Sequence, residues 1–259
     1  MGKVIAIAVP KGGVGKTTSV VNLGASLAVA EKKTLIIDFD ASGACSIALG
    51  FTPEKINGDI FDVFSYSKSI DKVIHKTDIP FLDFIPALVP SYQSEQRLEK
   101  LSSNIMFIAN VIRAQAESYD FILIDCPPYL KGMTTNAMAV SDSLLIPIRA
   151  ENFSLDALRK MMRHFEFVKQ MYNQRLKIEG IFFTMFEQHT KVSLLAMNDL
   201  IENFNGHLLK TVIPKNVTIS ESAFKGIPAV LFKAVSKGSQ AYLNLAIEIM
   251  NNNQEFITS

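Results

Sequence analysis

The feature that most constrains the fold is a glycine-rich loop close to the N-terminus. The segment Lys11-Gly12-Gly13-Val14-Gly15-Lys16-Thr17-Thr18 follows the apolar run Val4–Val9 and precedes a helical stretch, Val20–Ala30. Glycines let backbone N–H groups turn toward phosphate oxygens, and the helix N-terminus adds partial positive charge. This order of strand, loop and helix predicts a P-loop nucleotide-binding fold.

The side chains of the loop carry the expected phosphate chemistry. Lys16 can reach the β- and γ-phosphates of a nucleotide, and the Thr17 hydroxyl can ligate Mg²⁺. The general P-loop pattern would need glycine where Pro10 stands, and a second lysine, Lys11, precedes the glycine pair instead. We expect Lys11 on the outer rim, aimed at phosphate charge in a facing molecule.

Short apolar runs alternate with amphipathic segments along the rest of the chain. Most of the runs are continuously apolar, which is typical of strands covered on both faces. The expected strands are Val4–Val9, Thr34–Phe39, Phe81–Ile85, Phe121–Ile124, Ser143–Ile148, Gly180–Thr184 and Leu208–Ile213. The pattern predicts an α/β fold, a doubly wound and mostly parallel sheet flanked by helices, in one domain over residues 1–259. The region 51–90 mixes helix, turn and strand signals.

Composition narrows the class of protein further. The 26 basic and 25 acidic residues leave a net charge of +1, which excludes a globally basic nucleic-acid coat. The two cysteines, Cys45 and Cys126, are too few for a disulfide framework or a closed four-cysteine zinc site and suit a reducing cytosol. No run approaches the ~18 apolar residues of a membrane helix. We therefore expect a cytoplasmic protein.

Three carboxylates end expected strands. Asp38 and Asp40 close the run Leu35–Asp40, and Asp125 follows Phe121–Ile124. Side chains at the carboxyl edge of a parallel sheet face the ligand crevice, so these acids should lie near the phosphates. A carboxylate at the position of Asp125 can hold Mg²⁺ through water.

Lys11–Thr18 resembles the deviant Walker A signature of the ParA/MinD superfamily, and the resemblance runs from about residue 3 to about residue 250. It implies an ATPase that uses ATP and Mg²⁺ and dimerises face to face around two nucleotides, with Lys11 contacting the partner's ATP. By the same resemblance, Asp40 positions the attacking water and Asp38 helps to hold the metal. Ala41 and Ser42 stand where the family usually has proline and glutamine.

Two further segments are similar to family landmarks. Asp125-Cys126-Pro127-Pro128 matches the metal-binding strand end, and we expect Cys126 to be a small core residue rather than an iron–sulfur ligand, because Cys45 does not match the second ligand position. The segments Gly180–Met185 and Thr211–Asn216 resemble those that line the adenine. The resemblance implies that Pro214 and Asn216 flank the base.

Three classes of relative are compatible with the loop. A metabolic or electron-transfer relative would need cysteines that this chain lacks. A membrane-cycling ATPase of the MinD type needs a basic amphipathic C-terminal helix, whereas residues 251–256 carry one acid and no base. The third class is a partition ATPase of the short, Soj-like branch, without an N-terminal helix-turn-helix domain.

Candidate DNA contacts lie in two places. The stretch Arg159–Lys177 holds six basic residues against one acidic residue, and Arg159 and Arg163 share a helical face. A second group comprises Lys191, Lys210, Lys215, Lys225 and Lys233. Where the family commonly has arginines, this chain has His189, Lys215 and Thr218, and lysine lacks the bidentate fork of arginine.

The sequence therefore predicts an ATP-dependent DNA partition ATPase. Its ATP-bound homodimer is expected to bind DNA nonspecifically on the nucleoid, reading only the backbone. A ParB-like partner is expected to stimulate slow hydrolysis and release it. The alternative is a MinD-like membrane-cycling ATPase or one that positions a protein cargo.

Overall fold

The computed structural model describes residues 1–88, 104–151 and 154–257, and its centre is a seven-stranded sheet. The strand order is β3-β4-β2-β5-β1-β6-β7, and β3 pairs antiparallel with β4 while all other pairings are parallel. The strands are β1 (Lys3–Ile7), β2 (Thr34–Asp38), β3 (His75–Lys76), β4 (Leu82–Ile85), β5 (Phe121–Asp125), β6 (Ser143–Arg149) and β7 (Lys177–Thr184).

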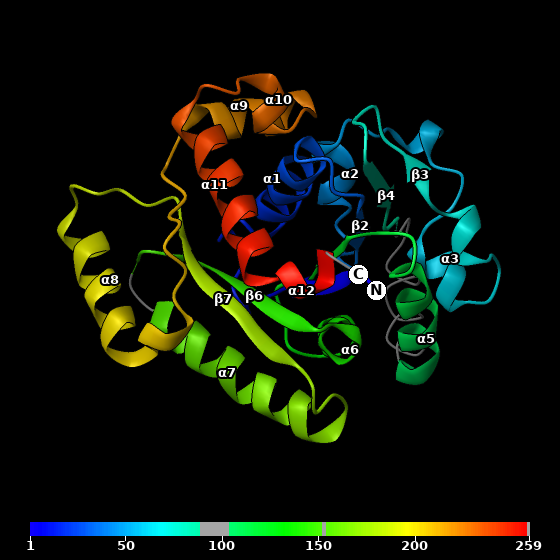
Figure 1. Ribbon diagram of the computed structural model, residues 1–259, viewed down its shortest axis with the longest axis horizontal. Helices are drawn as coiled ribbons and strands as arrows, with labels where there is room; N and C mark the ends of the chain where they lie inside the picture. Colours follow the sequence, from blue (N-terminus) through cyan, green and yellow to red (C-terminus); the bar gives the residue numbers. More distant parts are fainter. Residues whose placement is uncertain (89–103, 152–153, 258–259) are drawn as a thin grey trace.

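Helices cover both faces of the sheet (Figure 1). One face packs against α1 (Lys16–Val29), α10 (Ala229–Phe232) and α11 (Lys237–Asn252). The other packs against α3 (Ile60–Phe64), α5 (Ile105–Gln115), α6 (Met133–Val140) and α7 (Ser154–Met171). The remaining helices are α2 (Ala44–Ala48), α8 (Lys191–Phe204), α9 (Val217–Lys225) and α12 (Gln254–Ile257). The predicted doubly wound α/β class is confirmed.

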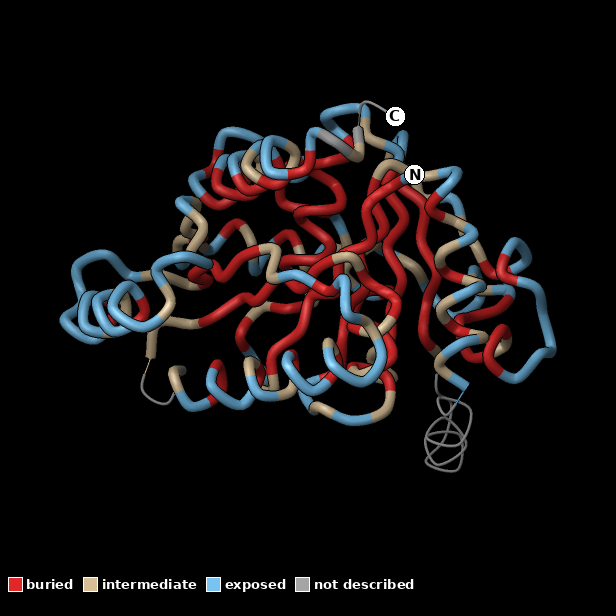
Figure 2. The backbone as a smooth tube through the Cα atoms, turned by 60° about the horizontal axis from the view of Figure 1, so that its bottom comes forward, coloured by how far each residue is buried: buried red, intermediate tan, exposed pale blue. Residues whose placement is uncertain are grey.

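The continuous apolar runs follow from this double cover. Within β1, Val4 and Ala6 face the core under α5–α7, whereas Ile5 and Ile7 face the core under α1 and α11. Successive side chains of a strand point to opposite faces, so both sets must be apolar when both faces are covered. The central strands are accordingly buried along their length (Figure 2).

The expected strand Leu208–Ile213 is wrong. This segment runs beside β7 and donates to it from the amides of Leu209 and Ile213, but it forms only isolated bridges. The carboxylate of Glu248 on α11 accepts the amide hydrogens of Lys210 (2.7 Å) and Thr211 (2.9 Å). The Glu248 side chain thus accepts from backbone amides that would point toward a neighbouring strand or solvent if the segment were a regular edge strand.

The region of mixed signals, 51–90, contributes the antiparallel edge. β3 pairs with β4 through His75↔Phe84 and Lys76↔Asp83. The short helix α3 carries a capping box, in which Asp59 accepts from the amide of Asp62 and the Asp62 side chain accepts from that of Asp59.

None of the helices in the described ranges is long and apolar enough to span a bilayer.

A buried polar cluster joins the first strand to the C-terminal helices. Lys3 forms an ion pair with Glu179 at 3.3 Å, and the two side chains are only 6% and 4% exposed. Glu179 also accepts hydrogen bonds from Ser143 and Asn253. Because every group here has a partner, the cluster holds β1, β6, β7 and the end of α11 in one arrangement.

Replacing Glu179 with alanine should destabilise the fold strongly, since Lys3 would become a buried charge without its carboxylate. We expect Glu179→Ala to lower the free energy of unfolding by about 3–5 kcal/mol. The matched control is Glu166→Ala on the exposed side of α7, which should change it by less than about 0.5 kcal/mol. Denaturant unfolding measures both, and equal small effects would contradict the structural role of Glu179.

Candidate nucleotide and metal site

The glycine-rich loop connects β1 to α1 in a conformation that depends on glycine. Gly13 (φ 70°) and Gly15 (φ 85°) adopt left-handed backbone conformations, and Gly15 is the N-cap residue of α1. A side chain at either position would be strained. No atom lies within 4 Å of the places where Cβ atoms would sit on Gly12 and Gly13. The loop is therefore open to solvent at Gly12 and Gly13.

Lys16 begins α1 and folds back over the loop. Its ammonium group donates to the carbonyl oxygen of Lys11 at 2.8 Å, and the residue is 7% exposed. Burial lowers the pKa of Lys16, while the nearby carboxylates Asp125 and Asp40 act in the opposite direction. A terminal phosphate beside this buried ammonium group would favour its charged form further.

Thr17 and two aspartates meet at the carboxyl edge of the sheet. Asp38 ends β2, Asp125 ends β5, and the two are paired residues in the parallel ladder. The Thr17 hydroxyl donates to Asp125 Oδ2 at 2.6 Å. The three predicted metal-binding residues are thus brought together from three elements.

The two aspartates are buried beside each other. Both are fully buried, and burial is the main cause that raises the pKa of each, to about 6 for Asp125 and well above its usual value for Asp38. Asp38 Oδ2 and Asp125 Oδ1 have no hydrogen-bond partner among the described residues. Two buried carboxyl groups with vacant oxygens, next to a threonine hydroxyl, fit the hard oxygen ligands that Mg²⁺ requires.

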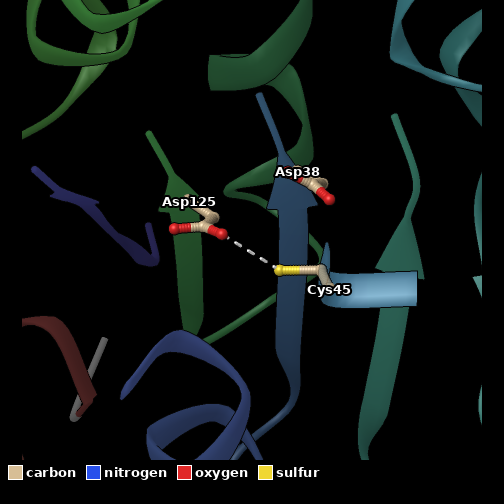
Figure 3. A group of neighbouring side chains, drawn as sticks. All are labelled: Asp38, Cys45 and Asp125. Carbon is tan, nitrogen blue, oxygen red and sulfur yellow. Dashed lines mark hydrogen bonds between the residues drawn. The ribbon is translucent and has the colours of Figure 1, made fainter. Parts of the chain in front are cut away.

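Cys45 joins this cluster from the start of α2 (Figure 3). Its Sγ donates to Asp125 Oδ2 at 3.3 Å, and one ligand atom from each of Asp38, Cys45 and Asp125 lies within 4.8 Å of the others. Gly43, the N-cap residue of α2, has a left-handed backbone conformation (φ 64°) and so turns the chain into this helix. Cys126, by contrast, is a buried side chain whose Sγ lies 3.8 Å from the Ile124 carbonyl oxygen.

Asp40 lies beyond the end of β2 and is half-buried. Its amide donates to Asp38 Oδ1 at 2.8 Å, and its own Oδ1 accepts from the amide of Ser42 at 3.0 Å. Its carboxylate interacts electrostatically with Lys16 and Asp125. The turn therefore holds Asp40 at the rim of the crevice, although its role toward water stays a prediction.

Lys11 forms an ion pair that the sequence did not predict. Its Nζ lies 2.7 Å from Glu151 Oε1, just past the end of β6, and Arg149 Nε lies 3.3 Å from Glu151 Oε2. The side chains of Lys11 and Glu151 are 26% and 33% exposed. Lys11 is thus held at the outer rim of its own loop, and reaching a second molecule requires it to leave Glu151.

A pocket of about 390 Å³ opens beside the loop. Gly15 and Thr18 line one side, and Pro214, Asn216 and Tyr242 line others. The Asn216 side chain caps α9 by accepting from the amide of Thr218 at 3.0 Å. The two residues expected to flank the base therefore line a pocket that adjoins the glycine-rich loop.

The basic residues proposed for DNA binding do not form one patch. Arg159 and Arg163 are exposed on α7, which covers one face of the sheet. Lys215 precedes α9 and Lys225 ends it, and α9 packs with α10 and α11 on the other face. Lys191 begins α8. Arg159 lies 3.9 Å from Asp156, and Lys215 lies 3.1 Å from Glu187.

Comparison with known proteins decides the family. A family model described as an AAA domain matches residues 2–178. The chromosome partitioning protein ParA of Myxococcus xanthus is 36% identical over 250 residues, covering 96% of this chain and 88% of that protein. The sporulation initiation inhibitor protein Soj of Bacillus subtilis is 36% identical over 252 residues, covering 97% of this chain and all of Soj. The chain belongs to the ParA/Soj family.

Solved structures agree with this ParA/Soj assignment. The cell division ATPase MinD of Pyrococcus furiosus has a TM-score of 0.81 at 28% identity, covering 97% of this chain and 99% of MinD. Cobyrinic acid a,c-diamide synthase of Mycobacterium smegmatis, solved with an ATP analogue and magnesium, has a TM-score of 0.82 at 25% identity, covering 95% of this chain and 93% of the synthase. The predicted superfamily resemblance is confirmed.

Two site residues of this ParA/Soj family member escaped the sequence prediction. Glu151 contacts Lys11, and Cys45 contacts Asp125. Thr184 belongs to the segment that was expected to line the adenine, and its hydroxyl, at the end of β7, donates to the Val14 carbonyl oxygen at 2.7 Å. A position just past a strand end at the carboxyl edge of the sheet is the one signal that could have indicated Glu151.

Removing one of the paired carboxylates should stabilise the nucleotide-free protein. The raised pKa values mean that the folded state binds protons more tightly than the unfolded chain, so the unfolding free energy falls as pH rises from about 4 through about 6. Asp38→Asn should therefore melt higher than the natural protein at about pH 8 with chelator present, and the gain should vanish near pH 4. A gain of about 1 kcal/mol corresponds to roughly 2–4 °C in a chain of this size.

The matched control is Asp71→Asn, because Asp71 is exposed. Its melting temperature should follow that of the natural protein at every pH. A lower melting temperature for Asp38→Asn at about pH 8 would contradict the destabilisation assigned to the two buried carboxylates, Asp38 and Asp125.

Proposed function

We propose that this protein is a Mg²⁺-dependent ATPase that drives DNA partition. The observation that carries the proposal is the convergence of Lys16, Thr17, Asp38 and Asp125 beneath an open phosphate loop. Its ParA and Soj relatives support the process, and the relative solved with an ATP analogue and magnesium supports the ligand.

In this mechanism the loop amides and Lys16 bind the phosphates, and Thr18, Pro214 and Asn216 orient the rest of the nucleotide in the adjoining pocket. Thr17 and Asp125 would hold Mg²⁺, with Asp38 orienting its waters. When bound, Mg²⁺ neutralises charge that develops on the phosphates. Asp40, at the rim, holds the attacking water in line.

The proposed active unit is a homodimer. Lys11 leaves Glu151 and approaches the terminal phosphate of the partner's ATP, because a bound triphosphate offers more negative charge than one carboxylate. A cation supplied in trans stabilises the charge spread over the transferring phosphoryl group. Hydrolysis is slow until a ParB-like protein completes this arrangement.

DNA binding is proposed for the ATP-bound dimer, which places the protein in the cytoplasm on the nucleoid. Lys215 lines the same pocket as the expected adenine contacts, so this basic group can respond to the nucleotide. The lysines would contact phosphates and not base edges, which gives binding without sequence preference. A membrane-cycling role, as in MinD, is the alternative that vesicle binding tests.

Three single variants separate the proposed steps. Lys16→Ala should lose ATP binding, because the buried ammonium group is the main phosphate contact.

Lys11→Ala should bind ATP with near-normal affinity and remain monomeric. Asp40→Ala should dimerise with ATP and hydrolyse it at least about 100-fold more slowly. Calorimetry, sedimentation and phosphate release measure the three outcomes. ATP-dependent dimers of Lys11→Ala would refute the role given to Lys11.

DNA binding should require ATP and weaken with salt. For the ATP-loaded dimer we expect Lys215→Ala with Lys225→Ala to reduce affinity and to lower the salt slope by about 1 for each DNA phosphate that the variant no longer neutralises. The matched control is Lys55→Ala, an exposed lysine outside both candidate groups, which should bind almost normally. Arg159→Ala with Arg163→Ala tests the candidate group on the opposite face in the same way. Titration with ATP, ADP and no nucleotide at two salt concentrations tests this. Binding that ignores nucleotide, or that moves to anionic vesicles, would contradict the partition proposal.

A further inference from the structure

The cluster of Asp38, Cys45 and Asp125 contains one ligand that magnesium does not use. Mg²⁺ takes oxygen ligands and keeps several waters, whereas a thiol favours softer divalent cations such as Zn²⁺, Cd²⁺ or Co²⁺. Here the Cys45 Sγ lies 3.3 Å from Asp125 Oδ2, inside the crevice proposed for Mg²⁺. The site therefore has a donor set that differs from an all-oxygen magnesium site.

The spacing of these donors suits a small tetrahedral ion. Zinc–sulfur and zinc–oxygen bonds of about 2.3 and 2.1 Å place neighbouring donors roughly 3.3–3.8 Å apart. The separation between Cys45 Sγ and Asp125 Oδ2 already lies in this range. One ligand atom from each of Asp38, Cys45 and Asp125 lies within 4.8 Å of the other two. Three protein ligands leave a fourth position for water, as in open zinc sites.

The electrostatics of the cluster also call for a cation. Asp38, Cys45 and Asp125 are all fully buried, and an oxygen of each aspartate has no hydrogen-bond partner among the described residues. Lys16 is the nearby cation, but its ammonium group donates to the Lys11 carbonyl oxygen. A dication bound by Cys45 Sγ and Asp125 Oδ2 would neutralise the charge of both buried carboxylates, which the cluster without an ion leaves desolvated.

We propose that Asp38, Cys45 and Asp125 form a binding site for a thiophilic divalent cation, and that its occupation excludes the magnesium nucleotide. On binding, the Cys45 S–H bond breaks, its proton leaves to solvent and an S–metal bond forms, with no change of oxidation state. Asp125 is the shared group, because its Oδ2 accepts from both Thr17 and Cys45. An ion bound by Cys45 therefore withdraws Asp125 from the site that Thr17 completes.

The proposed metal site does not depend on the proposed ATPase function. The exclusion of nucleotide does rest on that function. Metal binding is tested first, on the nucleotide-free chain, with Co²⁺ as the optical probe and Zn²⁺ as the competitor. The natural protein and Cys126→Ser should show the charge-transfer absorption of a thiolate–cobalt bond, and Zn²⁺ should abolish it. Cys45→Ser should lack this absorption and bind Zn²⁺ about tenfold more weakly or worse.

Cys126→Ser is a matched control because Cys126 is the other buried cysteine and its Sγ lies outside the cluster. If Cys45→Ser fails to fold in a thermal melt, Asp38→Asn replaces it as the test and should lose Zn²⁺ affinity to a similar degree. Absorption that is absent from the natural protein, or unchanged in the folded Cys45→Ser variant, would overturn the proposed site.

The second measurement is ATP binding by calorimetry in Mg²⁺, with and without Zn²⁺. Zn²⁺ should weaken ATP binding to the natural protein, a chelator should restore it, and Cys45→Ser should be insensitive. Equal ATP affinity with the zinc site filled would overturn the exclusion. A chain that takes Co²⁺ at Cys45 but never binds ATP would instead sink the ATPase proposal and leave the metal site standing.

Discussion

The parallel pairing of β2 with β5 sets the conditions for everything at the site. Register places Asp38 opposite Asp125 at the carboxyl edge of the sheet, where helices on both faces bury them. Such a pair destabilises a fold unless a cation or a proton neutralises it. The phosphate-binding loop lies next to this pair. The same two carboxylates that lower the stability of the empty protein are therefore the ones proposed to hold the metal ion of the nucleotide.

The surrounding residues divide the proposed work between the inside and the outside of the loop. Inside, Lys16 and Thr17 lie on the first turn of α1 and contact the loop carbonyl and Asp125. Outside, Lys11 is held by Glu151 at the end of β6. A lysine paired with a glutamate of its own chain keeps its charge solvated and its position fixed until a stronger anion approaches. This gives the proposed dimer a defined starting state.

The sequence predicted those parts of the site that depend on local order along the chain. The P-loop, the strand-ending Asp38 and Asp125, and the double cover of the sheet all follow from short-range patterns. The structure confirms the double cover and places Asp38 beside Asp125 at the ends of β2 and β5. Glu151 and Cys45 could not be predicted, because only the folded sheet and the left-handed turn at Gly43 bring them to Lys11 and Asp125. The strand predicted over Leu208–Ile213 was wrong because a distant residue decides its structure. Glu248 on α11 accepts hydrogen bonds from two amides of this segment, and no local pattern indicates that contact.

In the proposed mechanism two copies close on two ATP molecules, each supplying Lys11 to the other. A structure of the Asp40→Ala variant with ATP and Mg²⁺ tests this most directly, because slow turnover would preserve the nucleotide. We expect two protomers facing each other, with Lys11 Nζ released from Glu151 and within hydrogen-bond distance of the partner's terminal phosphate. A nucleotide-loaded monomer, or a dimer in which Lys11 still contacts its own Glu151, would contradict the mechanism.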